Sequence, residues 1–245
     1  MILAILQARL SSTRFPGKVL KPILGSPMLM RQIERIKRAS LIDVLLVATT
    51  NEVSDDPICQ LCDREGIKLF RGSLTDVLDR YYQAATDYSP DHVVRLTADC
   101  PLIDPEIIDQ VIQKHLNEGN DYTSNVFPAT FAHGLDVEVF TIDLLKRVWL
   151  EAKSQYDREH VSPYMRKLQG EIKLGNLLAE NDFTTYRWTV DYKEDYQLVL
   201  KIYEHLYLES PNFTTDDIIQ FLKNNSELLS INTDFKHIRG DACCD

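Results

Sequence analysis

The sequence predicts a three-layer α/β/α fold around a mostly parallel, mixed β-sheet. In the first 117 residues, four short apolar runs each precede a segment of helical periodicity, which is the pattern of a parallel sheet covered by helices on both faces. After residue 121 the strand-like segments include an alternating one, typical of a strand with one solvent-facing side. The first half is Rossmann-like. It lacks the glycine fingerprint of dinucleotide binding, so NAD or FAD is not expected.

The first half supplies the parallel strands and their helices. The expected strands are 1–6, 43–48, 67–70 and 91–96, and the expected helices are 27–38, 55–65 and 76–86, with another beginning at Pro105. Pro57 and Gly66 mark the beginning and end of the second helix. Asp104 precedes Pro105 and is the predicted N-cap of its helix.

The second half is expected to complete the same sheet. Its predicted strands are 122–126, 135–140, 172–178 and 185–190, and its predicted helices are 142–152, 157–168 with a kink at Pro163, 193–208 and 214–223. No internal repeat or low-complexity linker divides the chain. We therefore predict a single domain, 1–245, in which an excursion at about 121–182 covers an acceptor or forms a homodimer contact.

Composition excludes several classes of function. The 245 residues have ordinary globular composition, 44% hydrophobic, and a net charge of −10, which argues against nucleic acid or an anionic membrane as partner. No apolar stretch approaches the roughly 20 residues of a membrane span, and no signal peptide is evident, so a cytoplasmic protein is expected. The five cysteines, an odd number, fit a reducing compartment. Redox or zinc chemistry is not expected, since Cys59 and Cys62 lie inside a helical pattern.

The loop at 7–20 is the first candidate for binding. Arg9, Arg14 and Lys18 follow the first strand among small residues, at the sheet edge where open α/β folds bind ligands. Guanidinium and ammonium groups suit a polyphosphate; the alternative is an exposed basic loop. A Walker P-loop is rejected, because the required first glycine is missing and Val19 replaces Ser or Thr.

Two aspartates are candidates for metal binding. Asp99 and Asp191 each follow a predicted strand, and each could instead form a turn or cap a helix. Two carboxylates beside a polycationic loop provide the oxygen ligands that Mg²⁺ takes when it is shared with phosphates. Such an ion stabilises the charge that develops in an in-line displacement.

Three segments carry a family resemblance. Residues 8–20, Ala-Arg-Leu-Ser-Ser-Thr-Arg-Phe-Pro-Gly-Lys-Val-Leu, resemble the N-terminal signature of the cytidylyltransferases that make CMP-activated acylneuraminate and KDO (3-deoxy-manno-octulosonate). The branch named for spore coat polysaccharide biosynthesis protein F is the more similar. Residues 96–105 and 187–195 are similar to the second and late motifs of the family. The resemblance implies a nucleotidyltransferase fold and Mg²⁺-dependent transfer of CMP from CTP to a sugar or sugar-like acid.

The resemblance also implies roles for individual residues. Asp99 and Asp191 would bind the metal, and Arg9 and Lys18 would act with them in catalysis. The implied nucleotide-binding residues are Ala8, Arg9, Leu10, Ser11, Arg14, Lys18, Arg71, Ser73 and Asp99.

Candidate acceptor residues lie in two further segments, 133–138 and 158–164, which are similar to the spore coat branch and differ from the sialic-acid and KDO enzymes. They are Asp136, Glu138, Arg158, Glu159 and His160. Each has a structural alternative: solvent-facing strand carboxylates, an ordinary helix pair, and a structural histidine.

The predicted partners are therefore CTP and a sugar-acid or phosphorylated acceptor, with a role in surface polysaccharide synthesis. One alternative is a glycosyltransferase of related fold, although Thr97-Ala98-Asp99 does not complete the Asp-x-Asp motif of that class. The other is a catalytically silent nucleotide-binding scaffold. The identity of the acceptor stays open.

Overall fold

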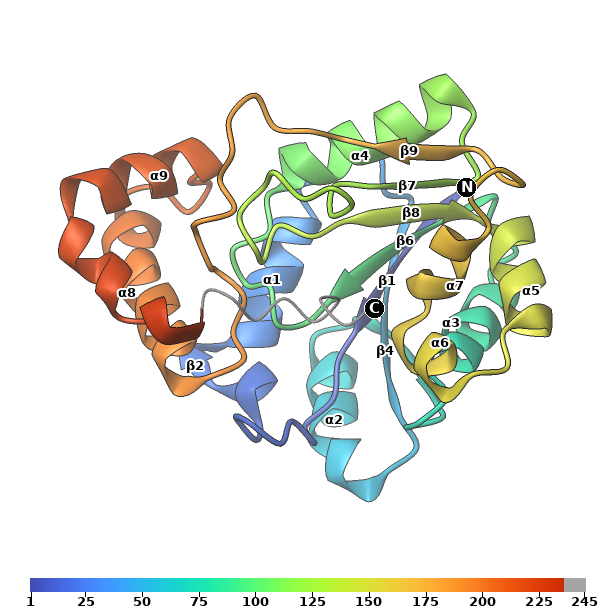
Figure 1. Cartoon of the computed structure of the whole chain (residues 1–245). Helices are drawn as coiled ribbons and strands as arrows, with labels where there is room; N and C mark the ends of the chain where they lie inside the picture. The colour runs from blue at the N-terminus through green and yellow to red at the C-terminus, as the bar shows by residue number, and fades with distance from the viewer. Residues whose placement is uncertain (236–245) are drawn as a thin grey trace.

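A seven-stranded mixed sheet forms the centre of the molecule, with helices on both faces (Figure 1). The computed structural model describes residues 1–235, so Cys243 and Cys244 lie outside the described residues. The strand order is β5-β4-β1-β6-β8-β7-β9. The strands are β1 Ile2–Gln7, β4 Val44–Thr50, β5 Lys68–Gly72, β6 His92–Thr97, β7 Tyr122–Ser124, β8 Glu138–Thr141 and β9 Leu174–Asn176. Within this sheet only β8 runs antiparallel to its neighbours.

Helices bury both faces of the sheet. One apolar core lies under α1 Met28–Ile36, α2 Asp56–Arg64, α4 Pro105–Glu118, α8 Lys193–Glu209 and α9 Thr215–Asn224. The other lies under α3 Val77–Thr86, α5 Ile142–Glu151, α6 Gln155–His160 and α7 Ser162–Lys167. Successive residues of β1 alternate between these cores, with Ala4 and Leu6 in the first and Leu3 and Ile5 in the second. The predicted fold class is confirmed, because the apolar runs of the first half form the parallel strands.

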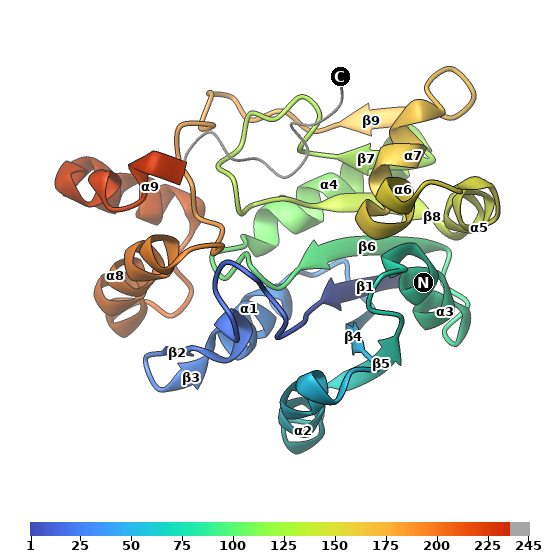
Figure 2. The same ribbon diagram turned by 60° about the horizontal axis from the view of Figure 1, so that its bottom comes forward.

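Short elements connect the larger ones. They are the 3₁₀ helices η1 Lys18–Leu20, η2 Val53–Asp55, η3 Ser226–Ser230 and η4 Thr233–Phe235, and the hairpin of β2 Pro22–Ile23 with β3 Ser26–Pro27. Figure 2 shows this hairpin beside α1, separate from the main sheet. The hairpin was not predicted from the sequence. Across residues 1–235, no helix combines the length and apolar character needed to cross a membrane.

The predicted strand 185–190 is wrong. The segment joins no ladder of the described sheets and makes one isolated bridge, between His133 and Arg187. Two successive amides, those of Trp188 and Thr189, donate to the single carbonyl of His133, at 2.7 and 2.9 Å, which is not the pattern of a β-ladder. A Cβ at Gly134 would lie 2.5 Å from the Thr189 nitrogen, so glycine permits this close approach.

The solvent-facing side predicted for 135–140 is also wrong. Regular strand begins only at Glu138, which is 4% exposed. Both faces of β8 are covered, because Val139 packs in one apolar core and Phe140 in the other. The Glu138 carboxylate is compensated by an ion pair with Arg95 and a 2.5 Å hydrogen bond from the Tyr122 hydroxyl.

The predicted helix 157–168 is two helices. They are interrupted at Val161, a buried β-branched residue with a φ of 70°. Pro163 occupies the first turn of α7, where proline is compatible with a helix. Cys59 and Cys62 lie on α2, as predicted.

We expect one buried histidine to make stability pH-dependent. His115 on α4 lies 3.0 Å from the ring of His92, and burial followed by the charge of His92 lowers the pKa of His115 to about 4. The unfolded chain takes up this proton near pH 6.5, so the stabilisation is complete above that pH and is lost as pH falls towards 4. Between pH 7 and pH 5 the loss should be about 2 kcal/mol. Urea unfolding at both pH values tests this, and His115→Gln should remove that part of the decrease.

Candidate active site

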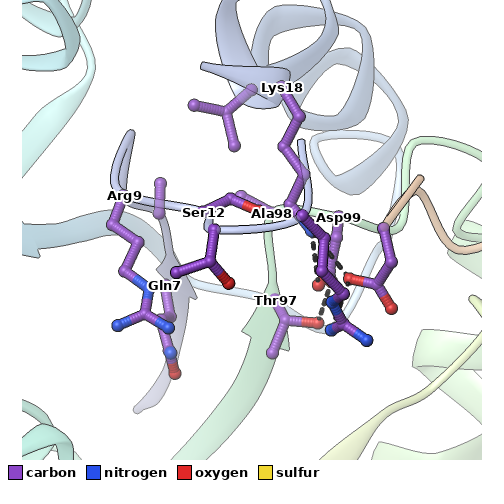
Figure 3. Close-up of a pocket in the computed structure, with 12 residues that line it drawn as sticks. Gln7, Arg9, Ser12, Lys18, Thr97, Ala98 and Asp99 are labelled. Carbon is purple, nitrogen blue, oxygen red and sulfur yellow. Dashed lines mark hydrogen bonds and ion pairs between the residues drawn. The ribbon is translucent and has the colours of Figure 1, made fainter. Parts of the chain in front are cut away.

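A cavity of about 170 Å³ opens at the carboxyl edge of the sheet, between the ends of β1 and β6 (Figure 3). Its lining comes from the loop after β1, from Thr97 to Asp99 after β6, and from Asp191. Parallel strands bring their carboxyl ends to one edge, so residues far apart in sequence meet here. The predicted residues that line it are Ala8, Arg9, Arg14, Lys18, Asp99 and Asp191.

The basic loop after β1 is a closed turn. The amides of Ser12 and Gly17 both donate to the carbonyl of Leu10, at 2.9 and 3.1 Å, and Gly17 takes a φ of 69°. The Leu10 amide donates to Asp55 at 2.7 Å, which fixes the loop against η2. Glycine is suited to this left-handed position immediately before η1, which begins at Lys18. The loop therefore positions its basic side chains rather than leaving them as a mobile basic surface.

Asp99 and Asp191 converge on one ammonium group. Lys18 Nζ lies 3.3 Å from Asp99 Oδ2 and 3.0 Å from Asp191 Oδ1, and it also donates to the Val190 carbonyl at 2.7 Å. Arg14 reaches the same Asp191 oxygen at 3.2 Å. The structure thus brings together the two carboxylates and two of the three cations of the loop.

The opposite charges of this cluster stabilise one another against the effect of burial on their pKa values. Burial alone would raise the pKa of Asp99, but the charge of Lys18 and the hydroxyl of Thr97, which donates at 2.6 Å, hold it well below its ordinary value. Burial also opposes the Lys18 ammonium, yet the two carboxylates raise the pKa of Lys18 above its ordinary value. Asp99 is therefore ionised and Lys18 is protonated at neutral pH.

A second ion pair, on the carboxylate oxygen that Lys18 does not contact, holds Asp191 in place. Arg187 Nη2 lies 3.0 Å from Asp191 Oδ2, and Arg187 also binds Asp195 through two hydrogen bonds. Asp195 accepts from the amides of Asp191 and Tyr192, and Tyr192 is the N-cap of α8. The alternative that Asp191 itself caps this helix is therefore wrong. Arg187 was not among the predicted site residues, because its ion pair with Asp191 depends on the irregular path of the chain between them.

Asn232 anchors this arrangement to the end of the described chain. Its Nδ2 donates to the Arg187 carbonyl at 3.0 Å and to Asp195 Oδ1 at 2.9 Å. Asp104, by contrast, is the predicted cap of its own helix: it accepts from the Glu106 amide at 2.9 Å. Asp99 and Asp191 are consequently the aspartates that face the cavity.

The other predicted nucleotide residues lie outside the lining. Arg71 donates to the carbonyls of Thr50 and Glu52 and pairs with Asp56, so it holds the connection between β4 and α2. Ser73 accepts from the Asp76 amide at 2.9 Å. Neither lines the cavity, nor do Leu10 and the exposed Ser11.

The predicted acceptor residues do not form one cluster. The Asp136 carboxylate lies 3.7 Å from His133 Nε2, and Glu138 is buried against Arg95. Arg158 pairs with Asp76 at 2.6 Å and donates to two main-chain carbonyls. Glu159 is exposed, and His160 packs against the ring of Tyr156. Their acceptor roles stay predictions.

The cavity suits a metal that is shared with a ligand. Among residues 1–235, no group of three or more His, Cys, Asp or Glu side chains could hold a metal ion alone. Asp99 and Asp191 nevertheless direct one carboxylate oxygen each at the same position, now contacted by Lys18. Two such oxygens fit Mg²⁺ when phosphate oxygens complete its coordination.

Comparisons with known proteins agree with this geometry. The cytidylyltransferase family model matches residues 3–234. Spore coat polysaccharide biosynthesis protein SpsF of Bacillus subtilis is 34% identical over 233 residues, 92% of this chain and 95% of that protein. The 3-deoxy-manno-octulosonate cytidylyltransferase of Pelobacter propionicus is 39% identical over 119 residues, 48% of this chain and 45% of that protein. A cytidylyltransferase structure from Leptospira borgpetersenii superposes with a TM-score of 0.89 at 34% identity, covering 93% of this chain and 96% of that one.

Proposed function

Since the chain belongs to the cytidylyltransferase family and is a CTP-dependent nucleotidyltransferase, we propose that it transfers CMP from CTP to a hydroxyl group of a sugar or sugar-like acid and releases pyrophosphate. The observation that carries the proposal is the meeting of Asp99 and Asp191 around Lys18 at the cavity floor. Opposite charges at one sheet edge suit a polyanion that arrives with a divalent cation.

The basic residues of the loop bind the triphosphate in this proposal. Arg9 lines the cavity and makes no ion pair among the described residues, so its guanidinium is available to an anion. The Arg14 side chain is 44% exposed, and its ion pair with Asp191 can be replaced by an ion pair with a phosphate. Lys18 and Arg14 then neutralise the charge that builds on departing pyrophosphate.

The reaction is a direct displacement at phosphorus. The acceptor oxygen forms a bond to the α-phosphorus of CTP, the bond from that phosphorus to pyrophosphate breaks, and the hydroxyl proton passes to solvent. Asp99 and Asp191 are the residues that would hold Mg²⁺, which lowers repulsion between the reacting oxygens. Thr97 and Arg187 keep the two carboxylates oriented through the second oxygen of each.

The acceptor is proposed from the resemblance of the later segments. Asp136, Glu138, Arg158, Glu159 and His160 stay the candidate acceptor residues, in a cytoplasmic enzyme that serves surface polysaccharide synthesis. SpsF, a relative of comparable length, is named for spore coat polysaccharide synthesis, whereas the match to the KDO enzyme spans about half of the chain. A homodimer contact through 121–182 stays a prediction.

Two measurements test the function. Titration of the purified protein with CTP and UTP, with and without Mg²⁺, should show metal-dependent preference for CTP. A panel of keto-sugar acids and phosphorylated sugars should then contain an acceptor that yields pyrophosphate and a CMP conjugate by mass spectrometry. Failure to bind CTP would overturn the proposal, and CTP binding without a conjugate from any acceptor would favour the silent scaffold.

Arg14→Ala should mainly weaken the binding of CTP. Among residues 1–235 the lost guanidinium contacts Asp191 and the Tyr192 side chain, and it is partly exposed. The KM for CTP should therefore rise about tenfold with a smaller change in kcat. Steady-state kinetics at saturating Mg²⁺ measure both constants. Arg64→Ala, an exposed arginine on α2, is the control and should leave both unchanged. A fall in kcat alone would contradict a binding role for Arg14.

A further inference from the structure

A buried carboxylate contacts the loop that carries Arg9. Asp55 is 0% exposed and immediately precedes α2, the position at which an aspartate ordinarily caps a helix. Its side chain makes no cap hydrogen bond to α2, so helix capping does not explain it. Its oxygens instead accept hydrogen bonds from the end of β4 and from the loop after β1. The mechanism proposed above does not use this carboxylate.

Both oxygens of Asp55 face hydrogen-bond donors. Oδ1 accepts from the Leu10 amide at 2.7 Å. Oδ2 accepts from the Thr49 hydroxyl at 3.1 Å and from both the amide and the hydroxyl of Thr50. An ionised carboxylate only accepts hydrogen bonds, so it can satisfy all four donors, whereas asparagine would place an NH₂ group opposite at least one of them. The surroundings therefore favour aspartate over its amide at this position.

The backbone is tied on each side of Arg9. The Ala8 amide still donates to the Ala48 carbonyl of β4, at 3.0 Å. Two residues later the chain has left the sheet, and the Leu10 amide takes Asp55 as its acceptor in place of a neighbouring strand. The carboxylate thus continues, for one more residue, the attachment of the chain to the end of β4.

Arg9 differs from the other two cations of the loop in what holds its side chain. Lys18 forms ion pairs with Asp99 and Asp191, and Arg14 forms one with Asp191. Arg9 lines the cavity, but its guanidinium makes no hydrogen bond or ion pair within residues 1–235. In Figure 3 its side chain lies apart from Lys18 and Asp99. The direction of Arg9 therefore depends on the backbone that carries it.

We propose that Asp55 is a positioning residue of the nucleotide site, which fixes the backbone at Leu10 so that Arg9 presents its guanidinium to the triphosphate. The inference rests on the proposed role of Arg9 in binding CTP, and Asp55 itself touches no ligand. Without this anchor the loop would hold Arg9 in a wider range of directions. Binding would then have to order the side chain again, which lowers the affinity.

Titration calorimetry with Mg²⁺-pyrophosphate tests the proposal, because this probe carries phosphate groups and neither base nor sugar. Asp55→Asn should bind it about tenfold more weakly than the wild type, and the KM for CTP should rise by a similar factor with a smaller change in kcat. A residue that only stabilised the fold would lower the unfolding temperature and leave the affinity of the folded protein unchanged.

A double-mutant cycle with Arg9→Ala identifies the route of the effect. If Asp55 acts through Arg9, the double variant Asp55→Asn/Arg9→Ala should bind Mg²⁺-pyrophosphate no more weakly than Arg9→Ala alone. Independent effects would instead multiply, and the double variant would then bind about tenfold more weakly than Arg9→Ala. Multiplied losses would overturn the proposal.

Thr50→Val is the milder variant. It keeps the size of the side chain and removes one donor to Asp55, so it should weaken the binding of Mg²⁺-pyrophosphate about threefold. This variant decides if Asp55→Asn does not fold. An unchanged affinity in folded Asp55→Asn, or in Thr50→Val if the first variant does not fold, would overturn this inference alone. A wild type that binds neither CTP nor Mg²⁺-pyrophosphate would overturn the proposed function with it.

Asp104→Asn is the matched control. Asp104 is also a buried aspartate, 3% exposed, and it accepts from the amides of Glu106 and Thr215 and from the Thr215 hydroxyl. It joins α4 to α9 and does not line the cavity that holds Arg9. The control should lower the unfolding temperature as Asp55→Asn does, while the affinity for Mg²⁺-pyrophosphate stays at the wild-type value.

Discussion

Asp99→Asn should reduce the turnover of CTP by a factor of about 10² to 10³, the scale of losing one preorganised charge at a reacting phosphate. The amide has the size of the carboxylate but no charge, so it ligates Mg²⁺ weakly. It also leaves the Lys18 ammonium with Asp191 as its remaining carboxylate. Initial rates of pyrophosphate release at saturating CTP and Mg²⁺ measure the loss.

The fold should tolerate this change. Asp99 lies in a loop at the end of β6 and contacts Lys18, Thr97 and Cys100, and none of these contacts pairs strands of the sheet. Circular dichroism and thermal unfolding should match the wild type closely. Asp63→Asn, at an exposed position on α2, is the control and should keep full activity. Wild-type turnover in Asp99→Asn would show that the metal lies elsewhere.

Lys18→Met should have the second largest effect, with a loss in kcat/KM on the order of 10²-fold, as expected when one partner of a buried charge cluster is removed. The substitution leaves Asp99 and Asp191 facing each other without their shared cation. It also removes a contact that the triphosphate needs in the proposed mechanism.

The pH profile identifies the cause of that loss. Burial raises the pKa of Asp99 and Lys18 opposes it, so removing the ammonium must raise this pKa. At a given acidic pH, less Asp99 is then ionised, and the acid limb of the pH–rate profile should move to higher pH. Lys18→Arg retains the charge and should keep the limb near its wild-type position. An unmoved acid limb in Lys18→Met would show that the limb reports another group.

The parallel half of the fold could be predicted because each strand there is a continuous apolar run buried on both faces. The position of Asp99 beside the loop after β1 followed from the rule that carboxyl ends of parallel strands share an edge. Asp191 reaches the same place without following a strand, because the Val190 amide donates to the Asp99 carbonyl at 2.7 Å. Glu138 was placed wrongly from the sequence. Alternation of apolar and charged residues indicates a solvent-facing side of a strand unless the charged residue has a buried partner. That partner, Arg95, lies 43 residues away.

Other features depend on contacts that the local pattern does not encode. The 185–190 segment has strand-like composition, but Trp188 and Thr189 bind the backbone of His133 from the side and no neighbouring strand pairs with it. Arg80 was indistinguishable from an ordinary helix arginine. Its burial against Gly72, with no carboxylate partner among residues 1–235, became evident only in three dimensions.

The reversed direction of β8 has a consequence for how specificity could diversify. Arg95 of β6 is opposite Glu138 of β8, so the chain enters β8 at the edge where β1 and β6 leave the sheet. The stretch before β8 therefore reaches this edge without being the connection that follows β1 or β6, although His133 and Gly134 within it must keep their contact with the Trp188 and Thr189 backbone. In this architecture, a new acceptor could be accommodated by remodelling one incoming stretch while the phosphate chemistry is inherited unchanged.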